Sequence, residues 1–253
     1  MTLDIAAKKP NWFSRLANPG QFLAWSRPLL LPLAVVTVLL FAAGLYLALF
    51  DSPPDYQMGE TVRIMYIHVP NAILSEAIYV VMAIASIGTL VWRHPLAEVA
   101  AKSAAPLGAV FTGLALFTGS LWGRPTWGTF WEWDGRMTST LILFLIYLGI
   151  IALWRAFEDQ GRAGRVIAVF TLVGALDIPV VKFSVDWWNT LHQTASISLM
   201  GDQHMAPSME IPLLVMTLAF LFLFITLDVM RMRTEIFRRR ADTLARQAAA
   251  SLS

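Results

Sequence analysis

Residues 122–137 read WGRPTWGTFWEWDGRM, a segment whose side chains are suited to binding a flat, partly charged molecule. Four of its sixteen positions are tryptophan, and indole rings offer broad stacking surfaces. The glycines between them allow the backbone to approach a ligand closely. Arg124 and Arg136 flank the rings and can pair with carboxylates through charge-assisted hydrogen bonds. The tryptophans are Trp122, Trp127, Trp131 and Trp133.

Two histidines stand near apolar stretches elsewhere in the chain, His68 in RIMYIHVPNA and His192 in DWWNTLHQ. Proline suits the first turn of a helix, so a helix is expected to begin around Val69–Pro70, with His68 at its outer end. If the second stretch is helical, Trp188 and His192 share a face. One interfacial histidine is more often solvated than a ligand. Two at similar depth beside an aromatic segment favour a ligand pair.

Together these groups match the surface of haem. Imidazoles can bind its iron from both sides, tryptophans can stack on the porphyrin, and arginines can pair with its propionates. The chain has no cysteine, which excludes disulfides and a thiolate haem ligand. It also lacks the C-x-x-C-H motif, so it is not itself a c-type cytochrome.

The elements that must position these groups are predicted to be membrane helices. Hydrophobic residues make up 57% of the 253 and charged residues 14%, whereas soluble domains carry about a quarter charged residues. Six apolar stretches reach the roughly 20 residues that a bilayer-spanning helix needs. We predict an all-α integral membrane protein, one six-helix domain over residues 1–253, with spans near 29–50, 69–92, 104–122, 138–154, 166–183 and 211–230.

The basic residues predict the orientation of this bundle. Of the 19 lysines and arginines, 15 fall on the side that holds both termini and four on the other. The Lys/Arg-rich side is normally cytoplasmic, so we predict cytoplasmic termini and outer segments at 51–68, 123–137 and 184–210. The Trp-rich segment, taken as 122–137, is then an outer loop. The four outer basic residues are Arg63, Arg124, Arg136 and Lys182.

Tryptophan also collects at membrane interfaces because its ring is amphipathic. That explains the single Trp25, Trp92 and Trp154 at the ends of predicted spans, but it explains the glycine-interleaved segment 122–137 less well.

Three further polar residues carry weaker predictions. Glu76 and Asp177 lie within predicted spans, where ionisable groups are functional candidates, although either could instead bind a partner helix or seat a kink. His204, in GDQHMAPS, is predicted to be a solvated loop residue, with a replacement haem ligand as the alternative.

The motifs resemble those of a known family. Residues 122–136 match the WWD signature of haem-handling membrane proteins, W-G-x-P-x-W-G-T-[FY]-W-x-W-D-x-R, without a gap, and Thr118-Gly119 resembles its T-G lead-in. The contexts M-Y-I-H-V-P and W-W-N-T-L-H-Q resemble the two histidine motifs of one branch. That branch is haem exporter protein C of the system I cytochrome c maturation pathway, and the likeness extends along nearly the whole chain.

The resemblance implies a haem-delivery function at the periplasmic face of the bacterial inner membrane. Members hold haem there and present it to a periplasmic haem chaperone, haem chaperone E. Our hypothesis is that the site holds oxidised haem flat with its edge exposed, so that a vinyl group can reach a nucleophile on the chaperone. They act in a complex with an ABC transporter, made of ATPase and permease subunits, and with a small one-span subunit. The chain has no Walker motif, so ATP hydrolysis is expected in the partner and the chain is not expected to be an enzyme.

The resemblance also assigns the site residues. His68 and His192 are the expected axial ligands of a non-covalent haem b, and the WWD residues cradle the porphyrin edge. Charge alone makes Arg136, Arg124 and Arg63 candidates for the propionates. The expected haem-edge platform consists of Trp122, Trp127, Trp131, Trp133 and Asp134.

Other classes of function fit the pattern less well. A bis-histidine b-type electron-transfer cytochrome usually places its ligand pairs within the bilayer, whereas both histidines here are predicted at the outer rim. A cytochrome c haem lyase or synthase is generally larger and has a second histidine pair. A solute permease would need polar groups along its spans, which are bare apart from Glu76, Asp177 and Asp228. Haem delivery is the function that the sequence favours.

Overall fold

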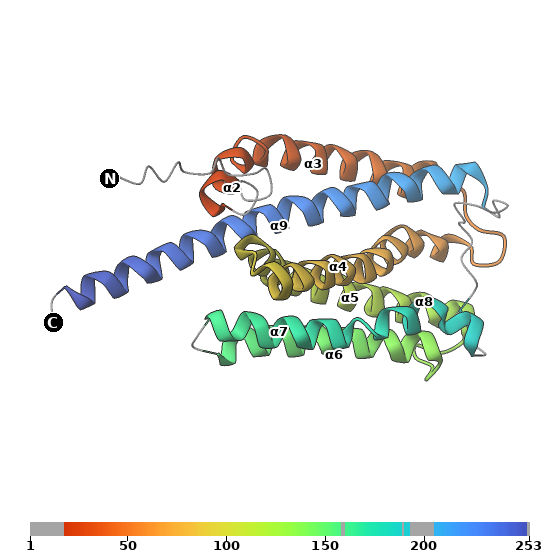
Figure 1. Ribbon diagram of the computed structural model, residues 1–253. Coiled ribbons are helices and arrows are strands. Elements are labelled where there is room, and N and C mark those ends of the chain that lie inside the picture. Colours follow the sequence, from red (N-terminus) through yellow and green to blue (C-terminus); the bar gives the residue numbers. More distant parts are fainter. Residues whose placement is uncertain (1–17, 158–159, 189, 193–204, 252–253) are drawn as a thin grey trace.

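The apolar stretches fold into long helices that run up and down beside one another in a computed structural model (Figure 1). The structure describes residues 18–157, 160–188, 190–192 and 205–251. Within those ranges there is no β-strand. The α-helices are α2 (Pro19–Ser26), α3 (Leu30–Tyr46), α4 (Met65–Trp92), α5 (Pro95–Trp127), α6 (Gly135–Ala156), α7 (Gln160–Gly174), α8 (Asp177–Trp187) and α9 (Pro207–Ala250). A π-helical turn, Leu47–Asp51, extends α3, and a 3₁₀ turn, Glu60–Ile64, precedes α4.

Six helical segments are long and apolar enough to cross a membrane, which identifies a multi-pass membrane protein. Each corresponds to one of the predicted spans, so the prediction of an all-α fold with six such helices is confirmed. The segments are Leu30–Asp51, Glu60–Trp92, Pro95–Trp127, Gly135–Ala156, Arg162–Trp187 and Pro207–Ala250.

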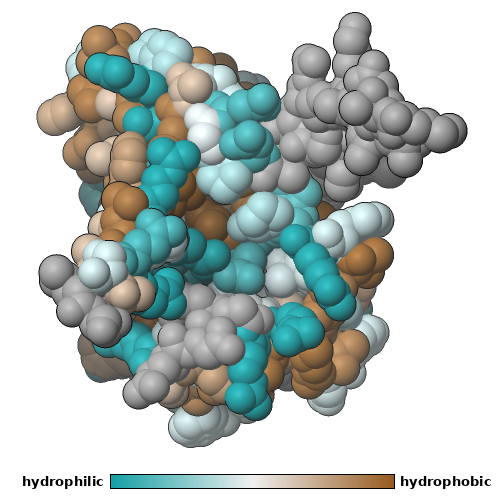
Figure 2. Space-filling view, turned by 60° about the vertical axis from the view of Figure 1, so that its left-hand side comes forward, coloured by the Kyte–Doolittle hydropathy of each residue, from teal (hydrophilic) through white to brown (hydrophobic). Residues whose placement is uncertain are grey.

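The helices form three layers, with α4 and α5 between the pair α3–α9 and the group α6–α8 (Figure 1). The starts of α4, α6 and α9 meet the ends of α5 and α8 at one end of the bundle, which we call the histidine end because His68 and His192 lie there. The opposite end, the basic end, carries most of the arginines. Hydrophilic residues gather at this end in Figure 2, with hydrophobic residues on the flanks.

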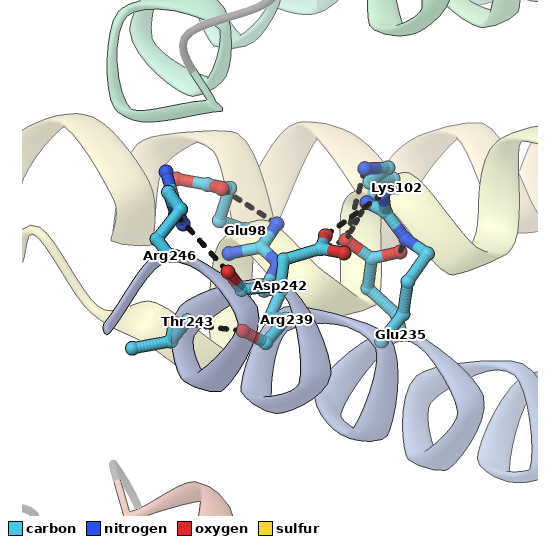
Figure 3. A network of polar contacts seen from close by, with 8 residues as sticks. Glu98, Lys102, Glu235, Arg239, Asp242, Thr243 and Arg246 are labelled. Carbon is cyan, nitrogen blue, oxygen red and sulfur yellow. Dashed lines mark hydrogen bonds and ion pairs between the residues drawn. The ribbon is translucent and has the colours of Figure 1, made fainter. Parts of the chain in front are cut away.

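At the basic end, a network of charged side chains joins α5 to α9 (Figure 3). The carboxylate of Glu235 accepts hydrogen bonds from Lys102 at 2.9 Å and from Arg239 at 2.8 Å. Arg239 also donates to Glu98 at 2.8 Å. Because α5 runs from this network to the histidine end, the network helps to fix the helix that carries part of the site.

Several helix boundaries differ from the predicted ones, and those at the histidine end bear on the site. Helix α4 begins at Met65 and contains Pro70, rather than beginning near it, because the preceding 3₁₀ turn already starts the helical path. Helix α5 continues through Trp127 and ends at Gly128, whose φ of 82° favours glycine. Only residues 128–134 therefore form a loop, in place of the predicted 122–137.

The fifth span is also not one helix. It breaks between α7 and α8 at residues 175–176, and Pro179 lies in the first turn of α8, where a missing N–H costs little. Tyr79 of α4 donates to the carbonyl of Thr171 just before the break at 3.0 Å. A side chain at Gly174 would place Cβ 2.2 Å from the Tyr79 hydroxyl, so the close approach of α7 to α4 requires glycine.

Candidate functional site

His68 projects from the start of α4 toward α5. Its Nδ1 lies 3.0 Å from the carbonyl oxygen of Ala115 and 3.3 Å from the hydroxyl of Thr118. A carbonyl oxygen can only accept a hydrogen bond, so Nδ1 of the neutral ring carries the proton and Nε2 keeps its lone pair. The Trp122 ring lies against the imidazole, with 5.8 Å between ring centroids. His68 is thus held in one tautomer with a ligand atom free.

His192 is held in a parallel way by a side chain. It follows the end of α8 in non-helical chain, so it does not share a helical face with Trp188 as the conditional prediction supposed. Its Nδ1 lies 3.1 Å from Oδ2 of Asp134, and its ring centroid lies 4.7 Å from that of Trp127. Burial lowers the pKa of His192 below 6.5, although the hydrogen bond to Asp134 opposes this shift. The imidazole is therefore neutral near pH 7, as a metal ligand must be.

Asp134 connects the Trp-rich loop to both a helix and a histidine. Its Oδ1 accepts a hydrogen bond from the backbone N–H of Met137 at 2.7 Å and so caps the start of α6, while Oδ2 holds His192. The side chain is only 4% exposed. Asp134 was predicted to belong to the haem-edge platform, and in this arrangement it also positions His192, a predicted axial ligand.

The two imidazoles line one cavity of about 100 Å³ at the histidine end. A metal-bound histidine typically donates its second ring N–H to a carbonyl or carboxylate, and each of these two imidazoles has such an acceptor. The described residues contain no group of three or more His, Cys, Asp or Glu that could hold a metal ion. Two imidazoles alone suit a metal that brings its own equatorial ligands, as haem iron does. The cavity is lined by His68, Ala72, Ser75, Glu76, Ala115, Leu116, Gly119, Arg136, Met137, Thr140, Val181 and His192.

The four predicted tryptophans divide into two pairs. Trp122 and Trp127, at the end of α5, each contact one of the two histidines. Trp131 and Trp133 lie in the loop, with ring centroids 5.4 Å apart, and Trp133 is 73% exposed. Trp133 is therefore open to the surroundings and Trp131 is partly buried, whereas the helical pair contacts the imidazoles.

Of the three predicted arginines, the structure brings one to the cavity. Arg136 lines it and donates to the Ser184 hydroxyl at 3.4 Å and to the Lys182 carbonyl at 3.2 Å. Arg63 bonds to Glu60 and to a backbone carbonyl outside the cavity lining. Arg124 bonds to the Gly128 carbonyl beyond the end of α5. The predicted ligand candidate His204 lies outside the described residues.

Gly119 helps to shape the site. The sequence pattern gave this residue no role except as part of the Thr118-Gly119 lead-in to the tryptophan signature. A Cβ built on it would lie 2.8 Å from Cε1 and 3.2 Å from Nδ1 of His68. Only glycine allows the imidazole to reach the Ala115 carbonyl, one turn earlier on α5.

We expect Gly119→Ala to weaken haem binding about tenfold or more, in the range found when the support of a metal ligand is disturbed. The added methyl group would force the His68 ring away from its acceptor. Titration of haem into the purified protein, followed by absorbance, measures this effect. Gly113→Ala is a matched control, because its Cβ would meet Phe144 of α6 at an ordinary 3.4 Å. Equal affinities in the two variants would contradict the role given to Gly119.

Comparisons with known proteins identify the family of the chain. Residues 12–247 match the family model described as Heme exporter protein C. The chain is 60% identical over 238 residues to Heme exporter protein C of Bradyrhizobium diazoefficiens, covering 94% of this chain and 90% of that protein. It is 45% identical over 217 residues to the protein of the same name from Escherichia coli K12, covering 86% and 84%. The Paracoccus denitrificans protein of this name is 43% identical over 233 residues, covering 91% and 96%.

The resemblance inferred from the tryptophan and histidine motifs is thus confirmed over nearly the whole chain. A six-helix membrane bundle that brings those motifs to one end, together with a family match over residues 12–247, shows that the chain belongs to the heme exporter protein C family.

Proposed function

We propose that this protein binds haem b non-covalently between His68 and His192 and delivers it for the biogenesis of c-type cytochromes. The observation that carries the proposal is the paired arrangement of the imidazoles, which share a cavity and have Nδ1 bound to an acceptor. In both rings Nε2 is left as the ligand atom. The names of the relatives, Heme exporter protein C, support haem as the molecule handled.

The site suits delivery better than permanent storage. A cavity of about 100 Å³ is smaller than the roughly 300–1,000 Å³ of pockets that enclose whole ligands, so the rim of a haem stays outside it. Trp131 and Trp133 lie on the loop that also carries Asp134, the partner of His192, and in this proposal they contact that rim. Arg136 lines the cavity and is placed for a propionate. His192 stands on non-helical chain and His68 on a helix, which favours release of one ligand while the other holds.

The delivery partner in this proposal is the periplasmic haem chaperone E. The loop at 128–134 and the termini would then face the periplasm and the cytoplasm of a bacterial inner membrane, respectively. ABC transporter ATPase and permease subunits and a small one-span subunit would complete the complex. The charge asymmetry supports this orientation, because 15 of the 19 basic residues belong to the terminal side.

The first test is spectroscopic. Haem added to the detergent-purified protein should give the low-spin absorption spectrum of iron with two nitrogen axial ligands. A high-spin spectrum, or no saturable binding, would overturn the proposed site.

The orientation can be tested separately because the chain has no cysteine. We expect Glu132→Cys, in the exposed loop, to react with a membrane-impermeant maleimide in intact spheroplasts. Thr243→Cys, exposed on α9 at the basic end, should react only after permeabilisation. The unsubstituted chain is the blank for both measurements. The reverse labelling pattern would place the histidine end in the cytoplasm.

A further inference from the structure

Glu76 is the one acidic side chain that lines the cavity among the described residues, and the site as set out so far gives it no role. It lies on α4 and shares the cavity with His68, His192 and Arg136. In the described part of the chain it makes no hydrogen bond or ion pair. Ionisable groups at membrane depth are costly unless a partner compensates them. Lys182 and Arg136 lie near enough to act on its charge, but neither forms a hydrogen bond or ion pair with it.

Glu76 lies about two helical turns from His68 along α4, so its charge is set back from the ligand atom. It follows His68 by eight residues, which is a rise of about 12 Å along the helix. Side chains on a helix lean toward its N-terminus, so the carboxylate of Glu76 leans toward the histidine end. Arg136 is the nearby cation that lines the cavity, and its guanidinium already donates to the Ser184 hydroxyl and to the backbone carbonyl of Lys182 on α8.

The oxidation state of haem decides how strongly such a carboxylate acts. With two neutral imidazoles, the iron–porphyrin core carries one positive charge in the ferric form and none in the ferrous form. A carboxylate therefore attracts only the ferric core. If the helical rise of about 12 Å is taken as the separation of carboxylate and iron, the interaction of two unit charges at an effective dielectric constant of about 20 is worth about tenfold in an equilibrium constant.

We propose that Glu76 sets the oxidation state of the bound haem by favouring the ferric form, an inference that rests on the proposed haem site between His68 and His192. The residue supplies charge and does not bind the iron. Its effect is a lower midpoint potential, so that the haem remains oxidised when it is presented.

Redox titration of the haem-loaded protein, with mediators at set potentials, tests this assignment. Glu76→Gln keeps the shape and removes the charge, and should raise the midpoint by about 59 mV, the equivalent of tenfold for one electron. Glu76→Asp keeps the charge and should stay near the wild-type value. Asp228→Asn is the matched control, since Asp228 has a buried carboxylate oxygen on α9, outside the cavity lining. It should leave the midpoint unchanged.

A second variant changes the charge in the opposite direction and does not depend on Glu76→Gln folding. Ala72 lines the same cavity one turn nearer to His68, so Ala72→Asp should lower the midpoint potential. Unchanged midpoints in Glu76→Gln or Ala72→Asp, with low-spin haem bound, would overturn the role of Glu76 and leave the haem site standing. Absence of low-spin haem from the wild type would overturn both proposals.

Discussion

Replacing either His68 or His192 by alanine is expected to abolish the low-spin haem spectrum. In the proposed site each imidazole supplies one axial ligand, so its loss would leave the iron with one nitrogen ligand and a high-spin spectrum. We expect both substitutions to have effects of similar size, because both imidazole rings line one cavity and both have Nδ1 bound to an acceptor. Absorption spectra of the purified variants, oxidised and reduced, measure the change.

Two controls separate loss of a ligand from loss of the fold. His94→Ala removes a histidine at the basic end, where its ring caps α5 by accepting from the Ala97 N–H at 3.2 Å, and it should retain the low-spin spectrum. Free imidazole should restore that spectrum in His68→Ala by filling the space left by the ring. A low-spin spectrum in both single variants without added imidazole would remove His68 and His192 from the axial positions.

Substitution of Asp134 is expected to have the second largest effect on haem binding and also to lower stability, because its carboxylate makes two separate contacts. Asp134→Ala removes the cap of α6 and the acceptor of His192 together. It should destabilise the protein by about 1 kcal/mol, the usual cost of a lost cap. It should also weaken haem binding by about 10- to 100-fold, the usual cost of a lost outer-shell partner. Thermal unfolding and haem titration measure the two effects.

Asp134→Asn separates these contacts. Its side-chain oxygen can still cap α6, but its NH₂ group then faces the Nδ1–H of His192 as a second donor. We expect near-normal stability with haem binding weakened as in Asp134→Ala. Glu132→Gln, an exposed acid two residues earlier in the loop, is the control for charge and should leave both measurements unchanged. Full haem affinity in Asp134→Asn would show that Asp134 serves only as a helix cap.

The number and type of helices could be predicted from sequence because they depend on composition over about 20 residues at a time. Breaks within them could not, because they depend on contacts. The fifth span divides at residues 175–176, where Gly174 packs against Tyr79 of α4, a residue far away in the chain. Helix α5 likewise continues through Trp127, although a stretch with two glycines and Pro125 predicted a loop there.

The candidate ligands could also be named from sequence, since imidazole and indole chemistry belongs to the residue type and the motifs are dense. Their roles within the site required the tertiary structure. The three arginines have the same charge, yet only Arg136 lines the cavity, because the other two bond to nearby groups outside it. Asp134 is part of the tryptophan signature, but its neighbours make it a support for His192.

The sequence by itself determined that this chain is a multi-helix membrane protein with two histidines and a tryptophan-rich segment able to meet haem, because hydropathy and side-chain chemistry are local properties. Only the tertiary structure decided which ring nitrogen of each histidine is free. The acceptor of His68 is a backbone carbonyl 47 residues away in the chain, and that of His192 is a carboxylate 58 residues away. Helix packing determines which acceptor each histidine meets, and a local sequence pattern does not encode that packing.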